Sequence, residues 1–329
     1  HAVLSVISPA LSPYSISYDS NPSSPSWIGE MIQNNRNTLP SSRMTFSKRP
    51  DGNLLKNLDP FSKIVPYIMY ARNDATNMMF EEVDCRPMDE YIRAQAAAGV
   101  ERTYMQVLIA SMVRTMYQRP QLNRFVIGGK TYQRNSIVVS FVVHRSLRGT
   151  SEETTIKLHF KGDETLSEIA DKISAAIDET VQEGNQNSTD KLAKIVTSVP
   201  YCIIWFIVKF LSLLDRHNLM PKSIVEASPF HSSFFITNLK SLGIDTIFHH
   251  IYNFGTTSQF ISLGKEKYKA VVVGKEHVEI KKILQLGIVT DERICDGFYF
   301  ASALKYMREL YLHPEALDNP PEKIVEDVD

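Results

Sequence analysis

Cysteine is scarce in this chain, and the few cysteines present lie far apart. The 329 residues include three, Cys85, Cys202 and Cys295, and no two of them form a C-x-x-C pair. A disulfide framework needs several cysteines, and a zinc site needs closely spaced ones. We therefore expect neither a disulfide framework nor a metal site, and we expect a reducing, cytoplasmic environment.

An excess of charge of one sign is also missing. The 36 basic side chains are balanced by 37 acidic ones, so no broad electrostatic field attracts nucleic acid or an anionic membrane. The first residues, HAVLSVISPALSPYS, lack the basic start of a secretion signal and the arginine-rich character of an organelle signal. These absences predict a cytoplasmic protein that does not bind nucleic acid.

Hydrophobic runs long enough to cross a membrane are absent as well. The most apolar stretch, VPYCIIWFIVKFLSLL at residues 199–214, is interrupted by Lys209. It is shorter than the roughly 20 apolar residues that span a bilayer. The stretch predicts a buried helix or a helix at a subunit contact, and a helix lying on a membrane surface is the alternative.

The chain opens with a polar segment. Residues 1–50 are rich in serine, proline and asparagine without sustained periodicity, which indicates an extended or disordered arm, or a leader ahead of Met44. The composition after this arm is that of a packed domain, and 43% of the whole chain is hydrophobic. Because such a chain can bury a large core, we expect one domain over residues 51–329.

Within that domain, strand-like and helix-like segments follow one another. Apolar residues at helical spacing predict helices over 103–117 and 165–181 and a last helix that ends at Pro314. Runs rich in β-branched residues predict strands at 77–85, 136–144 and 154–160 and several more between 233 and 290. The pattern predicts an α/β domain of two layers, in which one large mixed sheet is covered by helices on one face.

A motif ahead of the last helix carries the first functional signal. The stretch TDERICDG begins at Thr290. It resembles the motif Asp-His-Arg-x-x-Asp-Gly that precedes the last helix of the 2-oxo acid dehydrogenase acyltransferase family and of chloramphenicol acetyltransferase. The matching residues are Asp291, Arg293, Asp296 and Gly297. Glu292 stands where that family has its catalytic histidine.

Other segments resemble the same family in order and spacing. YQRPQLNRFVIGG, residues 117–129, is similar to a helix end and the strand after it, and FFITNLKSLGID, residues 234–245, is similar to a strand that reads FTISNLG. The resemblance spans roughly residues 55–315 and is closest to stand-alone members without a lipoyl domain. It implies the chloramphenicol acetyltransferase-like fold, a homotrimer with active sites between subunits, and coenzyme A as a substrate.

The resemblance also implies roles for individual residues. In the family the histidine takes a proton from a thiol, and a Ser/Thr hydroxyl stabilises the tetrahedral intermediate. Glu292 and Thr237 match these positions, and Asp296 would hold the active-site loop by pairing with an arginine. Four further residues are expected to contact the substrate: Asn238, Asn253, Arg293 and His144.

Glutamate in place of histidine leaves the chemistry open. A carboxylate has an ordinary pKa of about 4.3, so it takes a proton from a thiol of pKa about 8.5 less readily than an imidazole of pKa about 6.5 does. Burial in an acyl-transfer tunnel would raise the pKa of the carboxylate. Glu292 is thus a working base, the mark of a fold that has lost its chemistry, or a solvated loop charge. His144, His249 and His250 are substitute bases, and Cys295 is either an acylated thiol or a small buried side chain.

Two functions follow from these alternatives. As an enzyme, the protein would transfer an acyl group from coenzyme A to a small thiol, hydroxyl or amine acceptor. As a protein without catalytic activity, it would be a trimeric scaffold or an acyl-coenzyme A binder of the same fold. The sequence identifies neither the acyl donor nor the acceptor.

Overall fold

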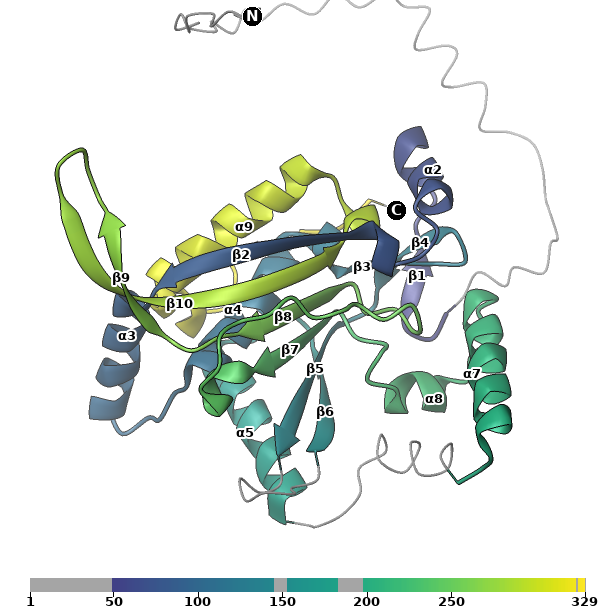
Figure 1. Ribbon diagram of the computed structural model, residues 1–329, viewed down its shortest axis with the longest axis horizontal. Helices are drawn as coiled ribbons and strands as arrows, with labels where there is room; N and C mark the ends of the chain where they lie inside the picture. The colour runs from purple at the N-terminus through teal and green to yellow at the C-terminus, as the bar shows by residue number, and fades with distance from the viewer. Residues whose placement is uncertain (1–48, 145–152, 183–197, 324, 329) are drawn as a thin grey trace, which may run out of the picture. The chain divides into compact units, whose positions relative to one another are not determined.

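The computed structural model describes residues 49–144, 153–182, 198–323 and 325–328, and its largest element is a seven-stranded sheet (Figure 1). The strand order is β2-β10-β8-β7-β5-β6, and β9 pairs with the first half of β10. The strands β5, β7 and β8 are parallel, and the other pairs are antiparallel. The bounds are β2 (Thr76–Asp84), β5 (Ile137–His144), β6 (Glu153–Phe160), β7 (Phe234–Asn238), β8 (Gln259–Leu263), β9 (Lys267–Val272) and β10 (Val278–Asp291).

Four helices cover one face of this sheet, and the sequence predicts three of them; the helix directly after the strand at 77–85 was not predicted. They are α3 (Cys85–Ala97), α4 (Tyr104–Gln118), α5 (Leu166–Gln182) and α9 (Gly297–Leu312). Thr103 and Gln106 form a capping box at the start of α4, and Thr165 and Glu168 form the corresponding one ahead of α5. The two-layer α/β prediction is confirmed.

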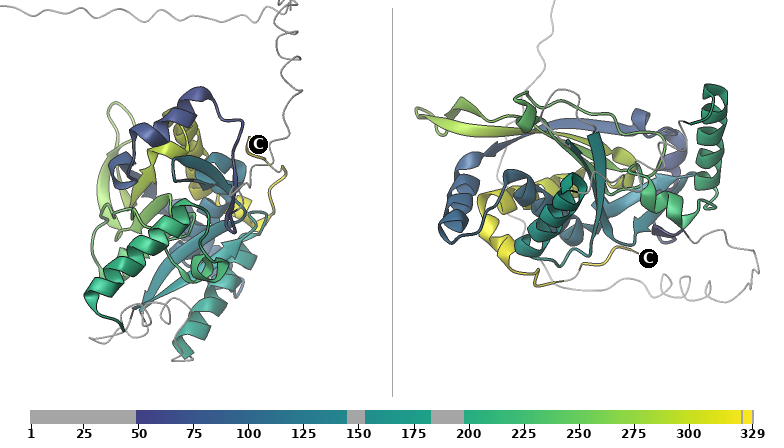
Figure 2. Two further views of the ribbon diagram at one scale, coloured as in Figure 1. Left: turned by 90° about the vertical axis from the view of Figure 1, so that its right-hand side faces the viewer. Right: turned by 90° about the horizontal axis from the view of Figure 1, so that it is seen from below.

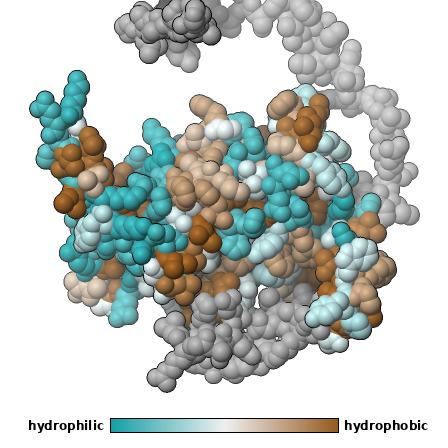
Figure 3. Space-filling model, in the orientation of Figure 1, coloured by the Kyte–Doolittle hydropathy of each residue, from teal (hydrophilic) through white to brown (hydrophobic). Residues whose placement is uncertain are grey.

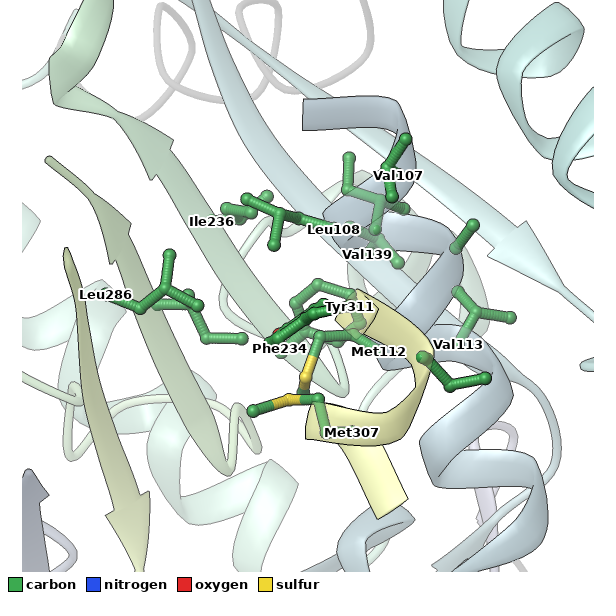
Figure 4. Close-up of a cluster of buried hydrophobic side chains, with 14 of the residues drawn as sticks. Val107, Leu108, Met112, Val113, Val139, Phe234, Ile236, Leu286, Met307 and Tyr311 are labelled. Carbon is green, nitrogen blue, oxygen red and sulfur yellow. The ribbon is translucent and has the colours of Figure 1, made fainter. Parts of the chain in front are cut away.

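The main hydrophobic core fills the space between the sheet and these helices. Figure 4 shows side chains of α4 and α9 meeting side chains of the strands. All of those labelled there are buried: Val107, Leu108, Met112, Val113, Val139, Phe234, Ile236, Leu286, Met307 and Tyr311. Burying a large apolar side chain stabilises the fold by about 1.5–3 kcal/mol, so this layer fixes the strands that carry the candidate site.

The opposite face of the sheet has a smaller cover. A second cluster there contains Phe235, Ile251, Phe260 and Val289, packed under the loop of residues 244–256. Toward the β2 edge, Phe80 stacks on Phe248 with ring centroids 4.2 Å apart yet stays about half exposed. We refer to this side as the open face of the sheet.

A separate three-stranded sheet was not foreseen from the sequence. The glycine pair Gly128–Gly129 between two short β-type runs predicts a hairpin, and the structure contains one, in which both glycines adopt the positive φ that a tight hairpin turn requires. However, its strands β3 (Arg124–Ile127) and β4 (Lys130–Arg134) pair with β1 (Gly52–Leu54) rather than with the large sheet. A three-residue strand is too short to show a periodic pattern, which is why β1 escaped prediction.

Two short helices and one long helix complete the description. They are α2 (Pro60–Ile68), α8 (Lys222–Ala227) and α7 (Tyr201–Arg216). The predicted arm lies outside the described residues except for Arg49 and Pro50. Arg49 is buried, and its guanidinium donates to the carboxylate of Asp215 at 2.7 Å.

Helix α7 confirms the predicted helix but not the predicted burial. Of its sixteen residues only Asp215 is buried within the chain, and Trp205 and Phe206 are each 64% exposed. The expectation of a buried helix is therefore wrong for the single chain, because the helix touches the rest of the protein along one stripe only. Among the described residues, no helix is long and apolar enough to cross a membrane.

Candidate functional site

The last strand of the large sheet ends at a buried carboxylate, Asp291. The Arg293 guanidinium donates to it twice, from Nε to Oδ1 at 2.8 Å and from Nη2 to Oδ2 at 2.7 Å. Arg72 approaches from the other side, with Nε 3.4 Å from Oδ2. All three side chains are buried, so one carboxylate neutralises part of the charge of two guanidinium groups. We call these three residues the Asp291 cluster.

The Asp291 cluster ties the motif to distant parts of the chain. The two arginines donate to five main-chain carbonyl groups, those of Met69, Tyr70, Val126, Tyr252 and Gly255. Burial lowers the pKa of Arg72 below its usual value, and the charge of Asp291 opposes that shift. The carboxylate is thus the group that makes two buried cations tolerable.

Glu292 projects away from this cluster. It opens a short 3-10 helix, η4 (Glu292–Ile294), which the carboxylate of Asp291 caps by accepting a hydrogen bond from the Arg293 N–H at 3.2 Å. Because the residues on both sides of it point inward, the Glu292 side chain points outward and is exposed in the single chain. It lines a cavity of about 690 Å³ together with Phe61 and Val65 of α2 and with Arg124.

The rest of the motif leads into α9. Asp296 caps that helix by accepting a hydrogen bond from the Tyr299 N–H at 2.8 Å. No arginine pairs with Asp296 among the described residues; within the motif, it is Asp291 that pairs with arginine. Burial raises the pKa of the Cys295 thiol to about 12, so this thiol stays protonated near neutral pH. Cys295 is partly buried and packs against the main core, which favours its interpretation as a small packing side chain.

Thr237 and Asn238 lie at the carboxyl end of β7. Thr237 is half-buried and shares the alternation of Phe235, so its side chain faces the open face of the sheet. The Asn238 side chain accepts a hydrogen bond from the Ser241 N–H at 3.3 Å and caps the short 3-10 helix η3 (Leu239–Leu242). Asn238 therefore supports the chain turn that follows Thr237.

The sheet register places Thr237 and Glu292 apart within one chain. Thr237 is opposite Ser262 of β8, and Ser262 is opposite Gly287 of β10. Glu292 follows five residues later, which at about 3.3 Å per residue and two strand spacings of about 4.8 Å gives a separation of roughly 15–20 Å. The two side chains of one protomer therefore cannot reach the same thioester.

The remaining predicted residues lie around the edges of this region. Asn253 accepts a hydrogen bond from the Asn73 N–H at 3.0 Å and lines a second cavity, of about 400 Å³, with Arg293. His249 stacks on Phe260 at 3.9 Å between ring centroids, and His250 is exposed. His144 is the last residue of β5. Arg293 thus lines both cavities, Glu292 lines only the first and Asn253 only the second, while Thr237 and Asn238 line neither.

A buried Ser-His-Asp chain escaped the sequence analysis. His231 Nε2 lies 3.0 Å from Asp215 Oδ2, and its Nδ1 lies 2.8 Å from Ser228 Oγ. All three side chains are buried, and Asp215 also accepts from Arg49, so the chain joins the end of α7 to the fold rather than exposing a nucleophile. In the printed sequence, the one usable signal was an aspartate at the end of an otherwise apolar helix.

The buried Ser228–His231–Asp215 hydrogen bonds should make the stability of the protein depend on pH. Burial lowers the pKa of His231, although Asp215 opposes the shift. The unfolded histidine, with a pKa of about 6.5, therefore binds a proton before the folded one does, and stability present above that pH is lost below it, by up to about 1.4 kcal/mol per pH unit. Urea unfolding from pH 7.5 down to 5.5 should show a smaller slope for His231→Gln than for wild type. The control is His313→Gln, at an exposed histidine, which should keep the wild-type slope of unfolding free energy against pH. An unchanged slope in His231→Gln would contradict the assignment.

No group of three or more His, Cys, Asp or Glu side chains suited to hold a metal ion occurs among the described residues. The candidate site is therefore built from a carboxylate, a hydroxyl, amides and guanidinium groups.

Comparison with solved structures shows which known fold the chain shares. No protein-family model and no curated protein matches the sequence. One similar structure is a dihydrolipoamide acetyltransferase from Azotobacter vinelandii, with 15% sequence identity and a TM-score of 0.50. The match covers 80% of this chain and 93% of the Azotobacter chain, whose structure was solved to define the catalytic roles of a serine, a histidine and an asparagine. The cubic core of a pyruvate dehydrogenase multienzyme complex is similar at 14% identity and a TM-score of 0.50, covering 85% and 99%.

A chloramphenicol acetyltransferase is similar at 11% identity and a TM-score of 0.46, covering 79% of this chain and 99% of its own. At such identities the comparisons establish the fold alone. The chain has the mixed α/β fold of dihydrolipoamide acetyltransferase catalytic cores.

Proposed function

We propose that this protein transfers an acyl group between coenzyme A and a small acceptor, at a site shared by two protomers of a homotrimer. Glu292 of one protomer is the base, and Thr237 of a neighbour donates to the developing oxyanion. The observation that carries the proposal is the turn that leaves Glu292 exposed on the wall of a cavity while its neighbours, Asp291 and Arg293, are buried and paired.

The separation of the two side chains supports a shared site. Thr237 faces the open face of the sheet, roughly 15–20 Å from Glu292 of the same chain. A heterologous interface places different patches of two identical chains together. Such an interface would bring the carboxylate of one protomer to the hydroxyl of the next and would desolvate both.

The spacing of functional residues in the Azotobacter enzyme agrees with this assignment. Its serine precedes its histidine by 52 positions, and the asparagine follows that histidine by four. In this chain Thr237 precedes Glu292 by 55 positions and Asp296 follows it by four. The similar order supports a hydroxyl, a proton acceptor and a loop-capping side chain at corresponding places.

The chemistry can be written with these groups. The Glu292 carboxylate accepts the proton of the attacking thiol, hydroxyl or amine, and the freed nucleophile adds to the thioester carbonyl. The Thr237 hydroxyl donates a hydrogen bond to the oxyanion of the tetrahedral intermediate. The carbon–sulfur bond to coenzyme A then breaks, and the proton held by Glu292 passes to the departing thiolate. Asn238 and Asn253 would contact the substrate, and Arg293 positions the turn.

The test is the rate of acyl transfer from acetyl-coenzyme A to a thiol reporter. A positioned base contributes about 10²-fold or more to such a rate. Glu292→Gln keeps the size of the side chain but cannot accept the proton, so its kcat/KM should fall by about 100-fold, whereas Glu292→His should retain activity. An unchanged rate in Glu292→Gln would show that another group is the base.

A binding protein of the same fold is the second candidate, and the carboxylate at the position of the family's histidine favours it. In that case acetyl-coenzyme A would bind in calorimetry, and neither wild type nor Glu292→His would transfer the acyl group. Absence of both binding and transfer would exclude the two candidates together.

A further inference from the structure

Helix α7 leaves an unusual amount of apolar surface uncovered. Its stripe of Ile204, Ile207, Leu211 and Leu214 is partly buried. The other sides carry exposed rings, with Tyr201 91% exposed and Trp205 64% exposed. A helix that is apolar on most sides is normally buried, so this one calls for a partner beyond the part of the chain that the structure describes.

The uncovered surface continues from α7 onto α2. The Arg216 guanidinium lies 5.2 Å over the Tyr70 ring and donates to its hydroxyl at 2.6 Å. The turn at Gly128–Gly129 lies between α2 and α7. A Cβ on Gly129 would meet the Tyr67 ring of α2, and a Cβ on Gly128 would meet the Arg216 carbonyl oxygen of α7. Figure 2 shows both helices on one side of the molecule in its left view, and Figure 3 shows apolar surface over each. We call residues 56–70, 128–130 and 201–222 the α2–α7 surface.

Cations dominate the charge of the two helical segments. Within residues 56–70 and 198–222, five basic side chains are exposed: Lys56, Lys63, Lys209, Arg216 and Lys222. Asp59, which caps α2, is the one exposed acidic side chain of these described segments, because Asp215 is buried. The net charge of the whole chain is −1, so positive charge is concentrated here.

We propose that the α2–α7 surface binds a membrane rich in anionic lipid. Sixteen helical residues are about 24 Å long, too short to span the roughly 30 Å hydrocarbon core, so α7 lies along the interface. Its aromatic rings suit the boundary between headgroups and acyl chains. Lysine and arginine side chains next to apolar surface extend toward phosphate groups.

Charge argues against a second copy placed face to face on this surface. Such an arrangement would bring the exposed cations of one protomer, these five and Lys130, against the same six of the other, with one exposed acidic group on each. Like charges at an interface disfavour association. An anionic bilayer satisfies both features of the surface, the uncovered rings and the cations.

The experiment uses the full chain carrying Trp27→Phe, which leaves Trp205 as the single tryptophan of the two in the sequence. Vesicles of phosphatidylcholine alone are compared with vesicles containing about 30% phosphatidylglycerol. We expect co-sedimentation and a blue shift of Trp205 fluorescence with the anionic vesicles only, and both should weaken in high salt. Phe206→Ser/Phe210→Ser and Lys209→Glu should each reduce binding by about tenfold or more.

A matched control lies on the β9–β10 hairpin. Tyr268 and Ile280 are 77% and 76% exposed, but lysines of their hairpin pair with acidic side chains of β2, as Lys269 does with Glu82 and Lys281 with Asp84. Tyr268→Ser/Ile280→Ser should bind vesicles like wild type. Equal loss in this control, or no binding of wild type to anionic vesicles, would overturn the proposal. If light scattering instead showed that Phe206→Ser/Phe210→Ser dissociates an oligomer without any vesicle binding, a second copy would be the partner.

Discussion

Asp291→Asn is expected to lower the free energy of unfolding by about 3–5 kcal/mol. The substitution removes a buried charge that faces Arg72 and Arg293 but leaves both guanidinium groups buried. Removing one partner of a buried ion pair is strongly destabilising, because the remaining charge has lost its compensation. Urea unfolding monitored by circular dichroism measures the effect, and acyl transfer should fall with it because the turn that holds Glu292 loses its anchor.

A matched control separates burial from charge removal. Asp245 pairs with Lys267 at 2.6 Å, but both side chains are about half exposed. Because exposed ion pairs contribute little, Asp245→Asn should leave the unfolding curve unchanged within error. If the two aspartate variants proved equally stable, the Asp291 cluster would not be the anchor described above.

Thr237→Ala is expected to lower kcat by about 10²–10³-fold while leaving the KM for acetyl-coenzyme A nearly unchanged. Removing a single oxyanion donor has an effect of this size, since the hydrogen bond strengthens only as charge develops on the carbonyl oxygen. The measurement is steady-state transfer to a thiol reporter.

Thr237→Ser is the control for this variant, because it keeps the hydroxyl and removes a methyl group. It should retain most of the wild-type kcat. If Thr237→Ala changed KM and not kcat, the side chain would contribute to uniform binding rather than to the transition state.

Much of the fold could be predicted because its signals are local. The capping pairs Thr103 with Gln106 and Thr165 with Glu168 mark the starts of two helices. The glycine pair at 128–129 marks a hairpin. These features depend on residues a few positions apart, so a single sequence displays them.

The candidate site depends instead on contacts between distant positions. Arg72 and Asp291 meet across 219 positions, and His231 meets Asp215 through a chain reversal. Nothing in the local pattern distinguishes these charges from solvated ones. The motif predicted an important residue at Glu292, but the inward direction of its two neighbours became visible only in the folded chain.

The exposure of α7 shows a different limit. An apolar run predicts that a helix is covered, but it does not identify the molecule that covers it. Asp215 anchors the helix end through Arg49 and His231, while the rings along the helix remain exposed.

The central claim, a site formed by two protomers, is tested most directly by mixing two inactive variants. Chains carrying Glu292→Gln and chains carrying Thr237→Ala are co-expressed in equal amounts with different tags, and mixed oligomers are purified through both. In a mixed cyclic trimer of either composition, about one interface in three receives an intact carboxylate from one chain and an intact hydroxyl from the next. Recovery of roughly a third of the wild-type rate is the predicted result, whereas mixed oligomers as inactive as the two parents would contradict a shared site.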